Sequence, residues 1–545
     1  MIQHNMVDYE KTYKEFKLDV PEFFNFAWDV VDRWAEDPEK LALWWVDDYD
    51  NEVKRTFRDL CSESLKVCNV LAHHGVKKGD VVMVILPRLI EWWVVNIACL
   101  RMGAVISPGT TQLTSRDIKF RLDASESVCI ITDADLAPRV DEVIHDCPGV
   151  RAKIIVGSHR EGWLNYANQV TEASGEFARV PARSDDSAIL YFTSGTTGYP
   201  KMTLHTHVSF PLAHSITGRF WLDLRPVDLH WNLSDNGWAK AAWSSLFGPW
   251  NMGAALFVHH SARFDARRTL ELLSRYPVTT LCGAPTNYRM LVLEDLKAYR
   301  FPTLRHCVAA GEPLNPEVIN IWKEATGITI RDGYGQTESV VLAGSFPCIE
   351  PRFGSMGKPS PGFVVEVIDD NCNILPPNKE GDIAVKVKPE RPIGLFREYW
   401  KSPEQTAKVY RGDWYITGDR AYKDEDGYLW FVGRADDVII MSGYRIGPFE
   451  VESALLEHKA VAESAVVSSP DEIRGEVVKA FVVLAPGYEA SDDLARELQE
   501  HVKKVTAPYK YPREIEFIDS LPKTVSGKIR RVELREREWG RKTRQ

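Results

Sequence analysis

The sequence predicts an α/β protein: a large N-terminal domain of two α/β blocks and a small β subdomain, followed by a small α+β C-terminal domain. In two regions, short β-branched runs alternate with helical stretches, which is typical of parallel sheets covered by helices on both faces. After about Arg434 the pattern becomes a compact mixture of strands and helices. A chain of 545 residues suits two to four structural units. We therefore expect domains at residues 1–434 and 438–545, joined by residues 435–437.

The first block is predicted from four β-branched runs and the segments between them. The stretch Leu89–Arg101 between the first two runs is apolar and helical, and Thr114 and Asp117 have the spacing of a capping box that opens a helix. The expected strands are Val81–Leu86, Ala104–Ile106, Val128–Ile131 and Lys153–Val156.

The second block follows a polar stretch, Glu172–Ser187, that we expect to be a surface loop. Beyond Gly354, short strands and turns predict the β subdomain. The expected strands of the second block are Ala255–Val258, Val278–Leu281, Arg305–Ala309 and Ile328–Ile330, with helices at Phe264–Tyr276 and Asn315–Thr326. The C-terminal domain is expected to contain strand Val438–Met441, helix Gly447–His458, strands Ala465–Ser468 and Lys479–Leu484, and helix Ala490–Lys504.

Composition excludes several classes of protein. No apolar run reaches the roughly 18 residues of a membrane span, because the best candidate, Val81–Leu100, is interrupted by Pro87, Arg88 and Glu91. The N-terminus has no apolar signal core and carries acids early, which predicts a cytoplasmic location. Nine scattered cysteines without a C-x-x-C pair indicate reduced thiols, not a zinc site. A net charge of −10 argues against nucleic-acid binding, although residues 501–545 hold 13 Lys/Arg against 6 Asp/Glu.

The segment Tyr191–Lys201, YFTSGTTGYPK, has the chemistry of a phosphate-binding loop. Glycines let backbone N–H groups approach an anion, and hydroxyls and a lysine complete the cradle. The Walker spacing is absent, which argues against a P-loop kinase or GTPase. The alternative is an ordinary Ser/Thr/Gly turn. The candidate residues are Thr193, Ser194, Gly195, Thr196, Thr197, Gly198 and Lys201.

This loop resembles that of the AMP-forming acyl-CoA synthetases, in the adenylate-forming superfamily that includes luciferases and peptide-synthetase adenylation domains. Residues 332–339, DGYGQTES, and 310–313, AGEP, resemble two further motifs of that family. The resemblance implies that Tyr334 stacks on adenine, Thr337 contacts the α-phosphate, and Glu338 is a catalytic residue that binds Mg²⁺. It also places Gly311, Glu312, Pro313, Asp332, Gly333, Gly335 and Gln336 in the nucleotide site.

Two later motifs resemble the ribose site and the domain hinge of the family. Asp419, in WYITGD, is expected to accept hydrogen bonds from both ribose hydroxyls, because one carboxylate can do so. Arg434 in GRADD resembles the second ribose contact, and Asp436 the hinge about which the small domain rotates. The resemblance thus implies a mobile C-terminal domain.

The C-terminal domain carries the remaining expected sites. Lys528, in the string LPKTVSGKI, matches the catalytic lysine of the family, which neutralises charge between the substrate carboxylate and the α-phosphate. The resemblance assigns contacts with CoA to Ser442, Gly443, Tyr444, Arg445, Arg474 and Tyr511.

Two positions bear on the acid that is activated. Trp238 is expected to face the acyl site, and Gly335 stands where acetate-specific relatives carry a tryptophan. Glycine there predicts room for a medium-chain, branched or aromatic acid. Residues 20–27, VPEFFNFA, also resemble the medium-chain acyl-CoA synthetase subfamily.

The resemblance implies an enzyme that uses ATP, with Mg²⁺, to convert a carboxylic acid to acyl-AMP and then to acyl-CoA. Alternatives are an adenylating enzyme with another acceptor, a benzoate or aryl-CoA ligase, and a non-catalytic relative that binds nucleotide. The sequence leaves the oligomeric state open, a homodimer included.

Overall fold

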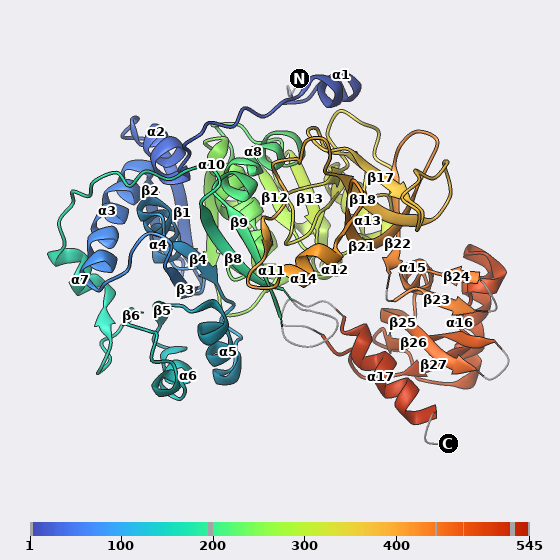
Figure 1. Cartoon of the computed structure of the whole chain (residues 1–545). Coiled ribbons are helices and arrows are strands. Elements are labelled where there is room, and N and C mark those ends of the chain that lie inside the picture. Colours follow the sequence, from blue (N-terminus) through green and yellow to red (C-terminus); the bar gives the residue numbers. More distant parts are fainter. Residues whose placement is uncertain are drawn as a thin grey trace.

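The computed structural model describes residues 4–193, 200–435, 437–441, 444–471, 474–523 and 529–542, with only the backbone of Tyr444, Arg445 and Pro508. Within this part of the chain the strands form four sheets, three in the large domain and one in the small C-terminal domain (Figure 1). The predicted α/β architecture, with a large N-terminal and a smaller C-terminal domain, is confirmed.

The first sheet contains the predicted first block. Its described strands lie in the order β19-β9-β8-β4-β3-β5-β6-β7, and those from β8 to β7 are parallel. Their bounds are β3 Val81–Ile85, β4 Val105–Pro108, β5 Cys129–Asp133, β6 Ala152–Val156, β7 Leu164–Asn165, β8 Ser187–Thr193, β9 Lys201–Thr206 and β19 Glu398–Tyr399.

The second sheet contains the predicted second block. Its described strands lie in the order β16-β15-β14-β13-β12-β10-β11-β1-β2. Their bounds are β1 Leu41–Asp47, β2 Glu52–Thr56, β10 Leu229–Asn232, β11 Ala255–His260, β12 Thr280–Gly283, β13 His306–Ala310, β14 Ile330–Tyr334, β15 Ala343–Gly344 and β16 Lys358–Pro359.

The two blocks exchange strands, which the sequence did not indicate. Strand β1, near the N-terminus, pairs in parallel with β11 of the second sheet, while β8 and β9, beyond the polar stretch, join the first sheet. Leu43 and Val46 of β1 are fully buried, Leu43 in the main core cluster and Val46 in the cluster of the second block. Each sheet is therefore completed by a segment from outside its own region of the sequence.

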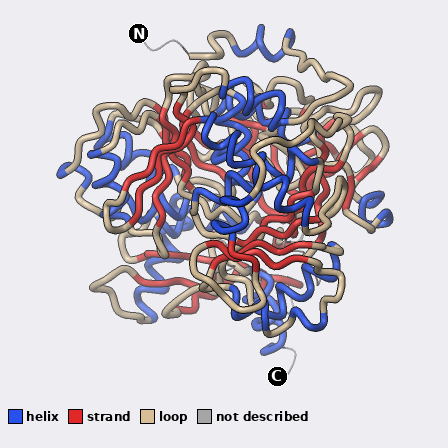
Figure 2. Tube along the Cα trace, turned by 90° about the vertical axis from the view of Figure 1, so that its left-hand side faces the viewer, coloured by secondary structure: helices blue, strands red, loops and turns tan. Residues whose placement is uncertain are grey.

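Helices separate and cover the sheets, and Figure 2 shows a column of helices with strands on either side. Helix α4 (Ile90–Met102) is buried on all sides, as expected for a helix that is apolar all round. Helix α5 (Ser115–Ser125) begins with the predicted capping box of Thr114 and Asp117. The other helices of this domain are α1 Tyr9–Glu15, α2 Asp32–Ala35, α3 Phe57–His73, α6 Ala137–Asp141, α7 Tyr166–Glu172, α8 His214–Ile216, α9 Ala239–Ala242, α10 Gly248–Asn251, α11 Ala266–Arg275, α12 Pro285–Leu291, α13 Pro316–Thr326 and α14 Pro403–Lys408, with π-helical turns η1 Ala27–Val31, η3 Val208–Leu212, η4 Thr217–Trp221 and η5 Trp243–Phe247, and 3-10 turns η2 Ile144–Asp146 and η6 Leu296–Ala298.

The β subdomain and the C-terminal domain follow. The subdomain is antiparallel and contains β17 Val365–Ile368, β18 Gly381–Lys386, β20 Tyr410–Arg411, β21 Trp414–Lys423 and β22 Leu429–Arg434. The C-terminal domain contains β23 Ile439–Met441, β24 Tyr444–Ile446, α15 Pro448–Leu456, β25 Val461–Asp471, β26 Gly475–Leu484, α16 Asp492–Val505, the 3-10 turn η7 Pro508–Lys510, β27 Glu514–Phe517 and α17 Arg531–Lys542.

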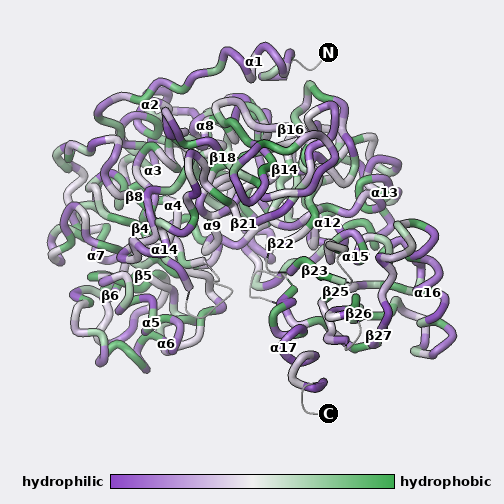
Figure 3. Tube along the Cα trace, turned by 45° about the vertical axis from the view of Figure 1, so that its right-hand side comes forward, coloured by the Kyte–Doolittle hydropathy of each residue, from purple (hydrophilic) through white to green (hydrophobic). Residues whose placement is uncertain are grey.

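Apolar side chains fill the space between these layers, and hydrophilic residues gather at the periphery (Figure 3). At one point the loops of the two large sheets meet without side chains between them. A Cβ atom on Gly237, after β10, would lie 2.2 Å from the backbone nitrogen of Thr110, after β4. Among the described helices, none is long and apolar enough to cross a membrane.

Candidate active site

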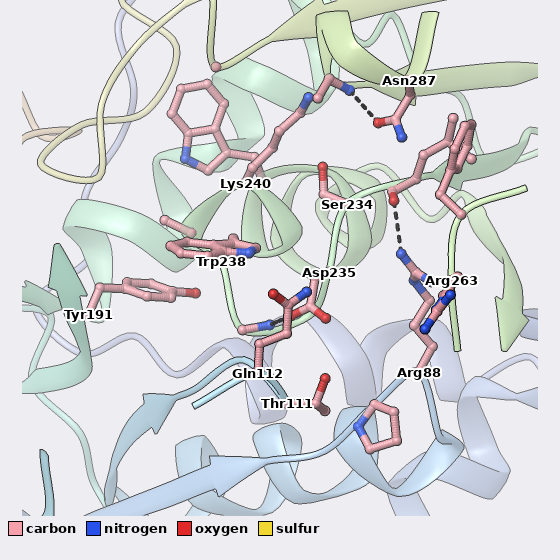
Figure 4. A pocket seen from close by; sticks show the side chains of 18 of the residues that line it. Arg88, Thr111, Gln112, Tyr191, Ser234, Asp235, Trp238, Lys240, Arg263 and Asn287 are labelled. Carbon is pink, nitrogen blue, oxygen red and sulfur yellow. Dashed lines mark hydrogen bonds between the residues drawn. The ribbon is translucent and has the colours of Figure 1, made fainter. Parts of the chain in front are cut away.

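A cavity of about 820 Å³ lies where the carboxyl ends of strands from both large sheets meet. Its walls come from the end of β8 and from the segments that follow β3, β4, β5, β10, β11, β12, β13 and β14, the usual place for a ligand site in open α/β sheets. In Figure 4, Tyr191 and Trp238 lie on one side and Arg88 and Arg263 on the other. Seven of the expected site residues line this cavity: Thr193, Trp238, Gly311, Glu312, Gly335, Gln336 and Thr337.

The residues expected at the ribose are already linked to one another. The buried carboxylate of Asp419 accepts hydrogen bonds from the Tyr334 hydroxyl at 2.6 Å and from Gln336 Nε2 at 2.8 Å. Arg434 Nε lies 3.2 Å from the other oxygen, because Asp419 and Arg434 are partners on neighbouring strands β21 and β22. The Tyr415 hydroxyl, which the sequence analysis missed, donates to Gln336 Oε1 at 2.9 Å. The polar groups of this site are therefore held in place before any ligand binds.

Glu338 has a structural partner that no motif indicated. The Tyr399 hydroxyl donates to Glu338 Oε1 at 2.8 Å, and Lys201 Nζ lies 4.7 Å from the centre of the Tyr399 ring. Burial raises the pKa of the Glu338 carboxyl, and the hydrogen bond from Tyr399 opposes this shift. Strand pairing sets Tyr399 of β19 beside β9, which Lys201 begins, and the Phe396 backbone nitrogen donates to the Glu338 carbonyl at 2.7 Å.

A second missed residue, His205, supports the peptide of Thr337 from within the core. His205 Nε2 donates to the Thr337 carbonyl at 2.7 Å, and Nδ1 lies 3.1 Å from Ser209 Oγ, which serves as its donor. This pattern requires the neutral imidazole, and burial lowers the pKa of His205 to about 3. His205 therefore holds Thr337 without adding charge.

Two residues of the DGYGQTES motif lie behind the cavity wall. The Asp332 carboxylate accepts from the backbone nitrogens of Gly333 at 2.9 Å and Leu314 at 3.4 Å, and burial raises its pKa to about 7. Trp221 packs against Gly333, where a Cβ atom would come within 2.4 Å of the indole. These two residues fasten β14 to its surroundings.

Lys240 connects the acyl side of the cavity with the segment expected beside adenine. Its ammonium donates to the carbonyls of Gly283 at 2.5 Å and Ala310 at 2.8 Å, at the ends of the neighbouring strands β12 and β13. Ala310 directly precedes Gly311, which has a φ of +107°. Because Lys240 lies two residues after Trp238, one short helix contributes to both parts of the cavity.

The cavity is lined by charged side chains of both signs. Arg88, Arg139, Arg263 and His260 line it, together with the acids Asp133, Asp135 and Asp235. Arg88 is held by its Nη2, which donates to the Leu233 carbonyl at 2.9 Å. Burial raises the pKa of the Asp235 carboxyl, and the backbone nitrogen of Gly237 and the charge of Arg88 offset part of this shift.

Several expected residues cannot be placed in this cavity. Ser194, Gly195, Thr196, Thr197, Gly198, Asp436, Ser442, Gly443 and Lys528 lie outside the described residues. The backbones of Tyr444 and Arg445 pair with β23. In the C-terminal domain, the Arg474 backbone nitrogen donates to Asp471 at 2.8 Å, and Tyr511 accepts from Arg513 Nη1 and packs on the domain core.

Comparison with known proteins agrees with this geometry. The model of the AMP-binding enzyme family matches residues 30–400, and that of the AMP-binding enzyme C-terminal domain matches residues 450–528. The chain is 56% identical to acyl-coenzyme A synthetase ACSM3, mitochondrial, of Rattus norvegicus, over 99% of this chain and 94% of that protein. It is 53% identical to acyl-coenzyme A synthetase ACSM4, mitochondrial, of Mus musculus, over 96% and 92%.

Solved structures give the same result. The anthranilate CoA ligase AuaEII in complex with anthranoyl-AMP is 31% identical, with a TM-score of 0.88 over 95% of this chain and 98% of that one. A benzoate CoA ligase from Burkholderia xenovorans LB400 is 27% identical, with a TM-score of 0.83 over 94% and 100%.

The expected cytoplasmic location is wrong, because the similar acyl-coenzyme A synthetases of rat, mouse and human are named mitochondrial. The composition of the N-terminal residues was not a sufficient guide. The family matches, the identity over almost the whole chain and the shared fold agree on one assignment. The chain belongs to the AMP-binding enzyme family, and it is an AMP-forming acyl-CoA synthetase of the medium-chain subfamily that activates a carboxylic acid to acyl-AMP and transfers the acyl group to CoA.

Proposed function

We propose that the acid is larger than acetate, with its carboxylate near Thr337 and its tail between Trp238 and the glycine-lined wall at Gly335. The observation that carries this proposal is the continuous cavity that joins a polar nucleotide side to an aromatic side lined by Tyr191, Trp238 and Trp243. Each buried methylene of an acid would contribute about 0.8 kcal/mol there, which favours acids with an apolar tail.

The nucleotide would bind along the linked polar residues. Asp419 would accept hydrogen bonds from the ribose hydroxyls, with Arg434 beside it, and Tyr334 would present its ring to adenine. The preformed contacts of Asp419 support this, because a carboxylate already fixed by three donors loses little further freedom on binding. Asp332 and Gly333 would not contact the nucleotide and would instead hold β14 in position.

Glu338 is the proposed ligand of Mg²⁺. The fit is chemical: Glu338 is a hard oxygen donor in a half-buried position, fixed through one oxygen by Tyr399, as ligating carboxylates usually are. When bound, Mg²⁺ would supply positive charge to the phosphates of ATP. The chain's own residues that serve the same purpose are Lys201, near Tyr399, and Lys528.

In the first step the acid carboxylate would attack the α-phosphorus and pyrophosphate would leave. A carboxylate is already ionised at neutral pH, so no general base is required, and positioning and charge neutralisation provide the catalysis. Thr337 would orient the α-phosphate from a peptide that His205 holds in place. Lys528 would neutralise the charge that develops between the two reactants.

In the second step the thiol of CoA would lose its proton and attack the carbonyl carbon of the acyl-adenylate, forming the thioester as the bond to AMP breaks and AMP leaves. Arg445 and Arg474 would pair with the phosphates of CoA, while Gly443 would leave room for the pantetheine arm. We propose that the C-terminal domain rotates about Asp436 between the two steps, so that Lys528 and Gly443 serve in turn.

The test is pyrophosphate release from Mg·ATP across straight acids from C2 to C12 and substituted benzoic acids, with Lys528→Ala as the inactive control. We expect release with several acids larger than acetate and none from the variant. Release with acetate alone would contradict the proposed acid class, and no release with any acid would contradict adenylation.

An aromatic acid is the second candidate. The similar structures include a benzoate CoA ligase and an anthranilate CoA ligase, and the tail site here is lined by aromatic rings that suit a flat substrate. We also propose a mitochondrial location, as for the similar synthetases, which imaging of the tagged full-length chain against a mitochondrial marker would test.

A further inference from the structure

We propose that Arg531 is a positioning residue for Lys528, which it holds in place for the first step through an ion pair with the buried Glu452. Arg531 begins helix α17 and stands three residues after Lys528 in the chain. In this role it needs no contact with a reactant, because it acts through the backbone that it fixes. The inference rests on the proposed role of Lys528 in adenylation.

Arg531 and Glu452 form a bidentate ion pair between α17 and α15. Nε of Arg531 donates to Glu452 Oε1 at 2.9 Å, and Nη2 donates to Oε2 at 2.5 Å. Only 4% of the surface of Glu452 is exposed, and its Oε1 also accepts from the backbone nitrogen of Val466 in β25 at 2.8 Å. Because two parallel hydrogen bonds fix the orientation of a guanidinium as well as its distance, the pair holds the start of α17 against both elements.

The half-buried side chain of Arg531 keeps its charge. Burial lowers its pKa, but the carboxylate of Glu452, with smaller contributions from Asp437 and Glu312, holds the pKa above the ordinary value. Glu312 belongs to the large domain and lines the cavity, so Arg531 lies close enough to the active site to interact with a charge in its wall.

The chain segments before and after the catalytic lysine are paired with each other. Lys523 and Ile529 form an antiparallel bridge, and the backbone nitrogen of Arg530 donates to the Pro522 carbonyl at 2.8 Å. Because Arg531 follows this pairing directly, its ion pair fixes the base of the intervening segment relative to α15 and β25.

A second anchor holds α17 near its other end. Glu538 is buried and accepts from Ser469 Oγ at 2.9 Å and from Lys479 Nζ at 2.6 Å. This anchor remains when the pair at Arg531 is lost, so the helix stays on its domain while its first turn is released. The effect should therefore be confined to the residues nearest the start of the helix, Lys528 among them.

Two variants remove the pair, and a neighbouring residue provides the control. Arg531→Met leaves the buried Glu452 carboxylate without its partner, which is strongly destabilising and can prevent folding. Arg531→Met/Glu452→Gln removes both charges and keeps an amide oxygen as acceptor for the Val466 nitrogen. Arg530→Met is the control, because Arg530 is one residue nearer to the lysine but is exposed and pairs with Glu533 at the surface, at 2.8 Å.

The experiment measures both half-reactions on one preparation of each full-length variant. These are ATP–pyrophosphate exchange with the acid that the wild-type enzyme prefers, and thioester formation from CoA and the supplied adenylate of that acid. The ratio of the two rates does not depend on the fraction of folded enzyme.

A displacement of about 1 Å can lower a catalysed rate by about a hundredfold. We therefore expect exchange to fall about ten- to a hundredfold in both variants that lack the pair, while thioester formation changes by less than about twofold. Arg531→Lys should recover part of the loss, because lysine keeps the charge but cannot bind both carboxylate oxygens in the same way. Arg530→Met should keep the wild-type ratio.

An unchanged ratio in Arg531→Met/Glu452→Gln would overturn the inference, whether both rates fall together or neither falls, and so would an equal change in Arg530→Met. If Arg531→Met does not fold, the double variant still decides the question. A failure of the proposed function looks different: the wild-type enzyme would show no exchange with any acid, or Lys528→Ala would retain full exchange.

Discussion

The nucleotide side and the acyl side of the cavity both extend from strand β14, but they are held by different forces. On the nucleotide side, Tyr334 and Gln336 donate hydrogen bonds of 2.6 and 2.8 Å to the buried carboxylate of Asp419. On the acyl side, Gly335 lies between these two residues and contacts the Trp243 ring without any hydrogen bond. Successive residues thus contribute to a directional polar network and to a packed apolar wall.

Because of this difference, the two sides are expected to tolerate amino-acid substitutions differently. Hydrogen bonds to charged groups are directional, and the loss of one partner leaves a buried charge, so the polar side tolerates little substitution. Apolar packing depends on volume, and volume-conserving changes usually cost less than about 1.5 kcal/mol. We therefore expect variants of the polar side to lose activity and variants of the acyl side to change the acid that is preferred.

The largest effect is expected for Asp419→Asn. The change removes the charge that holds Tyr334, Gln336 and Arg434, and each charged hydrogen bond contributes about 1.5–3 kcal/mol. The kcat/KM for ATP in pyrophosphate exchange should fall by roughly a hundredfold or more, for all acids alike.

Asp424→Asn is the control, because Asp424 binds Arg352 and Trp430 through similar contacts outside the cavity. A fall in Asp419→Asn that varied strongly with the acid would contradict the separation of the two sides.

Lys240→Met tests the connection between the sides and should have an intermediate effect. Without the ammonium, the Ala310 carbonyl is no longer held, and the segment beside adenine shifts. KM for ATP should rise about tenfold while the preferred acid stays the same, and Lys240→Arg should restore part of the loss. Lys78→Met, which removes a donor to the Pro181 carbonyl at the surface, should leave KM unchanged. A change confined to the acid preference would place Lys240 on the acyl side only.

Tyr399→Phe should have a smaller effect, because one hydrogen bond to Glu338 is lost and the ring below Lys201 remains. The Mg²⁺ concentration for half-maximal pyrophosphate exchange should rise about fivefold, as expected for a loss of ~1 kcal/mol. Binding of Mn²⁺ in the presence of a non-hydrolysable ATP analogue, followed by electron paramagnetic resonance, should weaken in parallel. Tyr13→Phe, which removes a donor to the Phe363 carbonyl, is the control, and equal Mn²⁺ affinity in both variants would exclude the role of Tyr399.

The smallest effect at neutral pH concerns His205, which acts on stability in acid. Its pKa in the folded state is about 3, below the ordinary value of 6.5, so the unfolded chain binds more protons between these values. Stability is therefore lost as the pH falls below 6.5, by up to about 1.4 kcal/mol per pH unit for this group. Thermal unfolding of His205→Gln should show a flatter decline from pH 6.5 to 4 than the wild-type enzyme. The exposed His145→Gln should retain the wild-type slope, and the same slope in His205→Gln would contradict the assignment.

The sequence predicted most elements of the fold and the motifs on the nucleotide side of the site. Strands such as β3 and β5 have continuous β-branched runs, and the capping box at Thr114 identifies the start of α5 from neighbouring residues alone. The nucleotide motifs are likewise short contiguous strings, so their members could be named before their contacts were known.

What the sequence did not predict depends on contacts between distant segments. Tyr399 reaches Glu338 across 61 positions of the chain, and His205 reaches Thr337 across 132. Trp243 was one of 17 tryptophans, with no local signal to distinguish it from core residues. The pairing of β1 with β11 was not predicted for the same reason, because the residues of a strand do not determine which sheet the strand joins.

The contact between Gly237 and Thr110 gives one residue control over the geometry of the whole catalytic chamber. With only backbone atoms at this crossing, the loop after β10 and the loop after β4 lie as close together as two backbones allow. Any larger residue at 237 would widen the gap, and every span from the nucleotide groups to the aromatic rings would lengthen together. The dimensions of the chamber therefore depend on a residue that lines the cavity without a side chain of its own.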